Sequence, residues 1–335
     1  NHMPRRSIYG HEKQLALLTG ALEKNRIPHA YLFSGMTGVG KKTVAIALAK
    51  RIHCNNANVA SFDACNRCPS CLKTDHHNHP DLLFLEPEGQ FIRIKAIRDL
   101  QAQMQYQPLE GKNRIIIIDD ADRMNITSAN ALLKTLEEPA PGNLLILVSG
   151  NPAGLPKTIL SRCQQVRFSP LNRDTIASYL RDHHALEEED AAMIAGASGG
   201  SLARAIEMVS GNYRAFRDKT LDDLMAMHNR DILKLLGFSA EFGKDREDIT
   251  RKLAVIQSCY RDALVFRETR SEDSLINRDR MDVISSLIRR FDGTELLEHL
   301  RTVGQALLAI DQNANKALTL ESMMFKLVHQ RQQEA

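Results

Sequence analysis

The stretch GMTGVGKKT at residues 35–43 comes close to a phosphate-binding loop, whose pattern is G-x-x-x-x-G-K-[ST]. The glycines and the lysine of this pattern are in place, with one more glycine inside the loop: Gly35, Gly38, Gly40 and Lys41. The hydroxyl that coordinates the nucleotide's magnesium should follow the lysine directly, but Lys42 stands there and Thr43 comes one position late. The loop amides and Lys41 could still hold phosphates, whereas a cation at position 42 cannot ligate a metal. ATP and magnesium binding therefore stay open from the loop alone.

Four of the six cysteines form the pattern C-x10-C-x2-C-x2-C: Cys54, Cys65, Cys68 and Cys71. A Cys-x2-Cys turn lets two thiolates reach one ion, and four thiolates complete a closed tetrahedral zinc site. Because no open position remains at such a zinc, the role is structural. The alternatives are reduced free thiols, a redox pair, or ligation by one of three nearby histidines: His76, His77 or His79. The other two cysteines, Cys163 and Cys259, are expected to be small core residues.

These residues need a scaffold, and the hydrophobic pattern predicts one. Short apolar runs predict strands at 30–34, 81–87, 113–122 and 144–149, and QQVRFS at 164–169 completes the strands. Helical spacing predicts helices at about 10–25, 41–53, 93–105 and 128–139, the last with Ser128 as its cap. Strands that alternate with helices in nearly continuous apolar runs indicate an α/β fold with a parallel sheet covered on both faces. The glycine loop then joins a strand to a helix, as a phosphate loop requires. Asp119 and Asp120 end the third strand.

The strand pattern stops at about residue 169. Residues 172–211 predict about three short helices around the Gly-rich turn at 195–201, and longer helices such as 246–267 and 294–312 follow. We therefore expect three domains: an α/β domain at 1–169 with a cysteine-rich insertion at 54–80, a small helical lid at 170–211, and a helical domain at 212–335.

Composition excludes several classes of protein. No apolar run approaches the roughly 18 residues of a membrane span, and no apolar signal segment opens the chain; Asn1 and His2 have the look of a cloning scar. The net charge of +3 is too small to indicate nucleic-acid binding by itself. With no Trp and 5% aromatic residues, the chain has few platforms on which single-stranded nucleic acid could stack. Clustered cysteines suggest a reducing compartment, and we expect a cytoplasmic protein without a membrane partner.

Several motifs together resemble the bacterial DNA polymerase III clamp-loader subunits of the AAA+ class. They are HAYLFSG at 29–35, the cysteine cluster, NALLKTLEEP at 130–139 and LPKTILSRC at 155–163. The resemblance implies an AAA+ domain, a lid and a C-terminal collar that joins subunits. It also implies partners: gamma/tau motor subunits, a delta subunit and, in the assembled complex at the nucleoid, the sliding clamp and primed DNA.

Two kinds of subunit share these motifs, the ATP-hydrolysing gamma/tau motor and the delta-prime subunit. HPDLLFLEPEG at 79–89 resembles delta-prime more closely. Three residues depart from the motor pattern. Lys42 replaces the threonine that binds magnesium. Asp120 replaces a glutamate and is one methylene short for positioning water. Ala203 replaces the lid arginine, with Arg204 one position on and so about 100° round the helix.

The resemblance therefore implies a subunit with little or no ATPase activity of its own. Asp119 could still support magnesium. Arg162 of the intact Ser-Arg-Cys motif is expected to act in trans, as an arginine finger on a neighbour's nucleotide. The alternative for Arg162 is a solvated or ion-paired surface arginine.

Other proteins remain as alternatives for the whole chain. They are the ATP-hydrolysing motor subunit, a zinc-dependent DNA-binding protein and an AAA+ branch-migration helicase. The basic residues Arg93, Lys95 and Arg98 are expected to be a solvated helix face.

Overall fold

The computed structural model describes residues 8–58, 61–227, 242–243 and 245–329. The chain divides into two compact units. The first comprises residues 1–176 and 200–204, and the second comprises 177–199 and 205–335. The division into domains at 1–169, 170–211 and 212–335 stays a prediction.

The first unit is built on a five-stranded parallel sheet in the order β2-β3-β4-β1-β5. Its strands are β1 (Ala30–Gly35), β2 (Leu82–Leu85), β3 (Arg114–Ile118), β4 (Asn143–Ser149) and β5 (Gln164–Phe168). All five coincide with strands predicted from the sequence, so the predicted α/β fold is confirmed. Neighbouring positions pair in register, for example Leu32 with Leu147 and Ile117 with Ile146. The carboxyl ends of β1, β3 and β4 therefore lie together.

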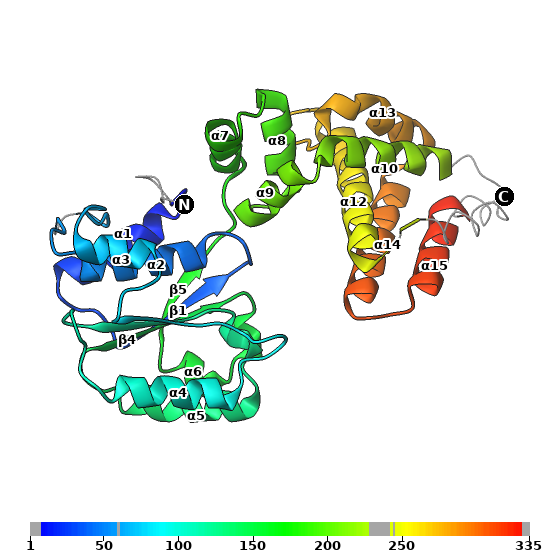
Figure 1. Cartoon of the computed structure of the whole chain (residues 1–335). Coiled ribbons are helices and arrows are strands. Elements are labelled where there is room, and N and C mark those ends of the chain that lie inside the picture. The colour runs from blue at the N-terminus through cyan, green and yellow to red at the C-terminus, as the bar shows by residue number, and fades with distance from the viewer. Residues whose placement is uncertain (1–7, 59–60, 228–241, 244, 330–335) are drawn as a thin grey trace. The chain divides into compact units, whose positions relative to one another are not determined.

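Helices cover both faces of this sheet (Figure 1). One face carries α1 (Glu12–Glu23), α2 (Lys41–His53) and α3 (Pro69–Asp75), and the other carries α4 (Ile94–Met104), α5 (Ile126–Glu137) and α6 (Lys157–Leu160). Successive strand residues point to opposite faces. Tyr31 and Phe33 accordingly belong to the core under α2, whereas Leu32 belongs to the core under α5. Two short 3-10 turns, η1 (Ala121–Arg123) and η2 (Pro152–Gly154), follow β3 and β4.

The start of α5 differs from the prediction. The helix begins at Ile126, and the side chain of Asn125 caps it by accepting a hydrogen bond from the Ser128 amide at 2.8 Å. Ser128 was the predicted cap, and this was wrong. Its hydroxyl instead donates to the carbonyl of Ile92 from a fully buried position. Both residue types are good caps, and burial decides between them.

The described residues of the second unit form helices joined by turns and loops, with no strand among them. Its elements are α7 (Arg173–His184), α8 (Glu188–Ala197), α9 (Leu202–Ser210), α10 (Tyr213–Met227), α12 (Arg246–Thr269), η3 (Arg278–Arg280), α13 (Met281–Arg290), α14 (Gly293–Asp311) and α15 (Lys316–His329). The first residues of α7 and of α9 are counted with the first unit. Gly199 and Gly200 between α8 and α9 have φ of 63° and 89°, as expected of the Gly-rich turn. The helices predicted at 246–267 and 294–312 are confirmed as α12 and α14. None of the helices that the structure describes has the length and hydrophobicity of a membrane span.

Candidate functional site

The glycine loop lies between β1 and α2, and neighbouring segments hold it in place. The ring Nε2 of His11 hydrogen-bonds the carbonyl of Val39 at 2.7 Å, and the ring packs edge-on against Phe168. Lys41 turns back onto the loop and donates to the carbonyls of Gly35 and Met36 at 2.7 and 2.8 Å. Burial lowers the pKa of Lys41, against the opposing effect of nearby aspartates. The predicted loop is therefore a compact and preformed turn.

Lys42 lies among acids at the carboxyl ends of two strands. Its ammonium nitrogen is 3.0 Å from Asp119 Oδ2 and forms a second ion pair with Glu86. Partial burial would lower the pKa of Lys42, but these two carboxylates outweigh it, and the pKa lies above its ordinary value. The lysine is thus charged and bound to the acid that was expected to support magnesium. Thr43 follows on α2, half-buried and one residue further round the helix.

The beginning of α9 packs directly against the glycine loop. The amide of Ala203 donates to the carbonyl of Gly38 at 3.1 Å. Gly38 has a φ of 80°, and a Cβ there would overlap the hydroxyl of Ser201. The structure therefore places the small Ala203 at the loop, while Arg204 is exposed.

The acidic end of β3 is ordered by contacts that the sequence did not reveal. Asp120 has a left-handed φ of 45°, and its carboxylate lies 3.5 Å from Arg123. Asp122 accepts hydrogen bonds from the Ser149 hydroxyl at 2.6 Å and from the Gly150 amide at 3.1 Å. Asp122 thereby ties the carboxyl ends of β3 and β4 together. The position of Asp122, an acid three residues after Asp119, is the feature of the sequence that could have indicated this role.

Arg162 stands between α6 and the edge strand β5, with 34% of its side chain exposed. One terminal nitrogen lies 2.7 Å from Glu137 Oε1, and the other donates to the carbonyl of Thr158 at 3.0 Å. Arg162 thus forms the surface ion pair that was the alternative to a finger. Glu137 belongs to the NALLKTLEEP motif, but nothing in the motif indicates this contact.

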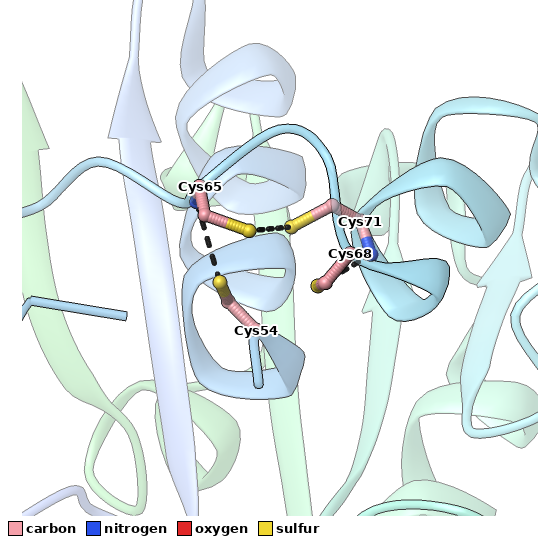
Figure 2. Close-up of side chains that lie close together, drawn as sticks. All are labelled: Cys54, Cys65, Cys68 and Cys71. Atoms are coloured by element: carbon pink, nitrogen blue, oxygen red, sulfur yellow. Dashed lines mark hydrogen bonds between the residues drawn. The ribbon is translucent and has the colours of Figure 1, made fainter. Parts of the chain in front are cut away.

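The four clustered cysteines converge on one point, as Figure 2 shows. Their sulfurs all lie within 4.8 Å of one another, and those of Cys65 and Cys71 are 3.9 Å apart. Zinc–sulfur bonds of about 2.3 Å in a tetrahedron place the sulfurs about 3.8 Å apart. Four thiolates with this spacing and no intervening disulfide fit a structural metal. Burial raises the pKa of the Cys71 thiol, so metal binding there releases a proton.

The cysteine cluster is joined firmly to the sheet domain. Lys50 of α2 forms a buried ion pair with Asp75 at the end of α3, at 2.6 Å. The rings of His53 and His79 stack in parallel, with centroids 4.1 Å apart. His79 is therefore engaged beside the cluster and not in it. Cys163 and Cys259 are both buried elsewhere, as predicted for core residues.

A parallel sheet with a glycine loop after β1, acids at the end of β3 and a helix packed on the loop defines an AAA+ domain. The family model described as DNA polymerase III, delta subunit, matches residues 10–172. A second model, which describes the C-terminal part of the DNA polymerase III delta subunit, matches residues 214–329. Together they match well over half of the chain. The chain belongs to the delta-prime subunits of the bacterial DNA polymerase III clamp loader.

The sequences of individual relatives agree with this family. The delta' subunit of DNA polymerase III from Bacillus subtilis is 29% identical over 317 residues, covering 93% of this chain and 94% of that protein. The tau subunit from Escherichia coli is 36% identical over 208 residues, covering 60% of this chain and 32% of that protein. The chain thus spans nearly all of the delta' relative but only about a third of the tau relative. The crystal structure of a gamma subunit-related protein from Thermotoga maritima covers 94% of this chain and 98% of that protein at 19% identity, with a TM-score of 0.44.

Proposed function

We propose that this chain is a clamp-loader subunit that does not hydrolyse ATP itself. The observation that carries the proposal is the ammonium of Lys42, bound to Asp119 and Glu86. Magnesium bridges the phosphates and neutralises developing charge in phosphoryl transfer. A fixed cation that is already paired with Asp119 repels a divalent ion and competes for its ligand. Ala203 stands where a motor subunit has its lid arginine, so a second positive charge that would assist phosphoryl transfer is missing.

The proposal gives Arg162 the role of an arginine finger on a neighbouring motor subunit. Its position beside an edge strand and its partial exposure support this role. The γ-phosphate gathers negative charge in the transition state, and a guanidinium offers a planar fork of donors to its oxygens. The residue would act on a nucleotide that another chain binds.

The cysteine cluster completes the proposal as a structural zinc site. Cys54, Cys65, Cys68 and Cys71 would hold the ion, which supplies four bonds that fix the fold of the insertion. The partners would be gamma/tau and delta subunits, with the sliding clamp and primed DNA in the assembled complex. Such a complex works in the bacterial cytoplasm, at the nucleoid.

Two ATPase measurements test the proposal. The purified chain should hydrolyse ATP negligibly, and turnover at the rate of a motor subunit would instead identify it as a gamma/tau-type enzyme. The second measurement uses the complex reconstituted with cognate gamma/tau and delta subunits. Arg162→Ala should leave assembly intact and sharply lower DNA-stimulated hydrolysis, since such fingers contribute roughly 10³–10⁵-fold at the site they serve. Unchanged hydrolysis and clamp loading would mean that Arg162 is only a surface residue.

A further inference from the structure

The carboxylate of Glu137 lies against the guanidinium of Arg162. Glu137 is the last residue of α5, and its Oε1 is 2.7 Å from a terminal nitrogen of the arginine. The other terminal nitrogen donates to the carbonyl of Thr158 at 3.0 Å and to the hydroxyl of Ser161 at 3.4 Å. Three acceptors of the same chain thus fix the plane of the Arg162 guanidinium, and no neighbouring subunit is needed for this.

The packing beneath this contact holds the two helices at a fixed spacing. Leu136 of α5, Ile159 of α6 and Cys163 belong to one buried cluster, with exposed fractions of 2%, 0% and 8%. Glu137 directly follows Leu136, and Arg162 directly precedes Cys163. The core therefore sets the distance between the carboxylate and the guanidinium.

A carboxylate at the C-terminal end of a helix is unfavourable, and Glu137 is in this position. The last turn of a helix has a partial negative charge and favours cations. Lys134 fits this preference, but Glu137 ends α5 and Glu138 is its C-cap. Arg162 offsets this unfavourable charge only for Glu137. A residue that breaks a local rule and is compensated by a single contact is a candidate for a functional role.

The contacts leave part of the guanidinium available to a ligand. The Nε of Arg162 has no partner among the described residues, and 34% of the side chain is exposed. A long arginine side chain carries considerable rotamer freedom, which is lost when it is fixed on a ligand. An arginine that is already oriented loses less of that freedom when it meets a phosphate.

We propose that Glu137 is a positioning residue, which orients the guanidinium of Arg162 for the γ-phosphate on a neighbouring subunit. This inference rests on the proposed function of Arg162 as a finger. Glu137 itself touches neither nucleotide nor reacting atoms. Its effect is to raise the fraction of time that the finger spends in the productive orientation.

The test is the DNA-stimulated ATPase of the reconstituted complex with Glu137→Ala, and with Glu138→Ala as the matched control one residue on. Exposed ion pairs are worth little, so Glu137→Ala should lower kcat by about three- to fivefold and leave the KM for ATP and the mass of the complex unchanged. Glu137→Gln keeps an oxygen acceptor and should lose less. Glu138→Ala should match the unaltered complex.

The double variant separates positioning from a general structural role. In the Arg162→Ala background, Glu137→Ala should cause no further loss, because it acts only through the arginine. A kcat that is unchanged or raised by Glu137→Ala alone would overturn the positioning role. So would a further loss in the Arg162→Ala background as large as the loss that Glu137→Ala causes alone. If Arg162→Ala itself had no effect, the finger would fail and the positioning role with it. A steep loss with Arg162→Ala beside no loss with Glu137→Ala would sink the positioning role alone.

Discussion

Lys42 differs from a threonine by its charge as well as by its length. Its pKa lies above the ordinary value because Glu86 and Asp119 outweigh the effect of burial. It therefore stays protonated at neutral pH. Its positive charge neutralises the two carboxylates, which would otherwise attract a divalent ion. The sequence predicted Lys42 as the defect in the loop. It could not predict the contact with Glu86, because that depends on how β2 aligns with α2.

Lys42→Thr should make nucleotide binding dependent on magnesium. The substitution frees Asp119 and supplies a hydroxyl, so a fluorescent ATP analogue should bind more tightly with magnesium than in EDTA. Hydrolysis should remain negligible, because Asp120 and Ala203 are unchanged and such groups act as a unit. Lys13→Thr, at an exposed position on α1, is the control. Equal magnesium-dependent binding by the unaltered chain would contradict this account of Lys42.

Arg162→Lys should rescue little of the activity that Arg162→Ala removes from the reconstituted complex. Lysine keeps the positive charge, but a single ammonium on a flexible stem cannot replace the planar fork. The ATPase of the two variants, measured side by side, distinguishes charge from geometry. A lysine variant close to the unaltered complex would show that charge alone matters.

Asp81 shows how one side chain orders a whole connection between elements. It is fully buried before β2, and its carboxylate accepts hydrogen bonds from the amides of Leu109, Glu110 and Gly111 at 2.7–2.9 Å. Burial alone would raise its pKa, but these amides and Arg114 outweigh burial and hold the pKa below the ordinary value of 3.8. These hydrogen bonds to the buried Asp81 carboxylate thus hold the segment between α4 and β3 in place.

Asp81→Asn should destabilise the first unit by about 2–4 kcal/mol, because a charged acceptor is lost and Arg114 loses its buried partner. A lower urea midpoint would show this, and Asp99→Asn on the exposed face of α4 should change it little. The depressed pKa also sets the pH dependence. The folded state gains from ionised Asp81 above about pH 4, and this gain is lost as the pH falls through the lower folded pKa. A variant as acid-sensitive as the unaltered chain would argue against this role.

The cysteine insertion should depend on its metal, while the sheet should not. Elemental analysis should find about one zinc per chain, and Cys68→Ser should abolish most of it because three thiolates leave the tetrahedron open. Amide hydrogen exchange should then increase over residues 54–80 and stay unchanged in β1, β3 and β4. Cys163→Ala should retain the zinc. Two disulfides among the four cysteines of zinc-free protein would refute the metal site.

Helices and strands were predictable from the sequence where the spacing of the apolar residues shows a helical or a strand pattern. Four strands are short apolar runs, and β5 at the edge of the sheet has its apolar residues at alternate positions, so all five were found. The helix α3 was not predicted, because its seven residues are too few to show a period. The start of α5 was misplaced because Asn125 and Ser128 are both good caps, and only the tertiary contact of Ser128 with Ile92 decides between them. The contact between Glu137 and Arg162 was unpredictable for the same reason.

At the scale of the whole molecule, the subunit should join its complex through the helices after residue 212. α14 and α15 carry large apolar side chains that are exposed in the chain alone, including Leu308 at 62% and Leu318 at 65%. Apolar side chains of this kind are what a joining surface on these helices would bury.

A chain ending at Asn212 should therefore fail to assemble with cognate gamma/tau and delta subunits. Native mass measurement of the mixture would show this, and circular dichroism would check that the remaining sheet domain is folded. Full incorporation of the shortened chain would place the joining surface in the first unit instead.

The stacked rings of His53 and His79 have a consequence for how this chain can be rebuilt. They hold the last turn of α2 beside the approach to β2, so the segment between them leaves the sheet domain and returns to the same place. A segment whose ends meet can be exchanged as one unit, provided that Lys50, which would lose its buried partner Asp75, is replaced with it. A turn of a few residues, a length common between such elements, could replace it, or a protease site or a fluorescent domain could be spliced in. The clamp-loader framework would then accept a reporter at this position without a change in the order of its strands.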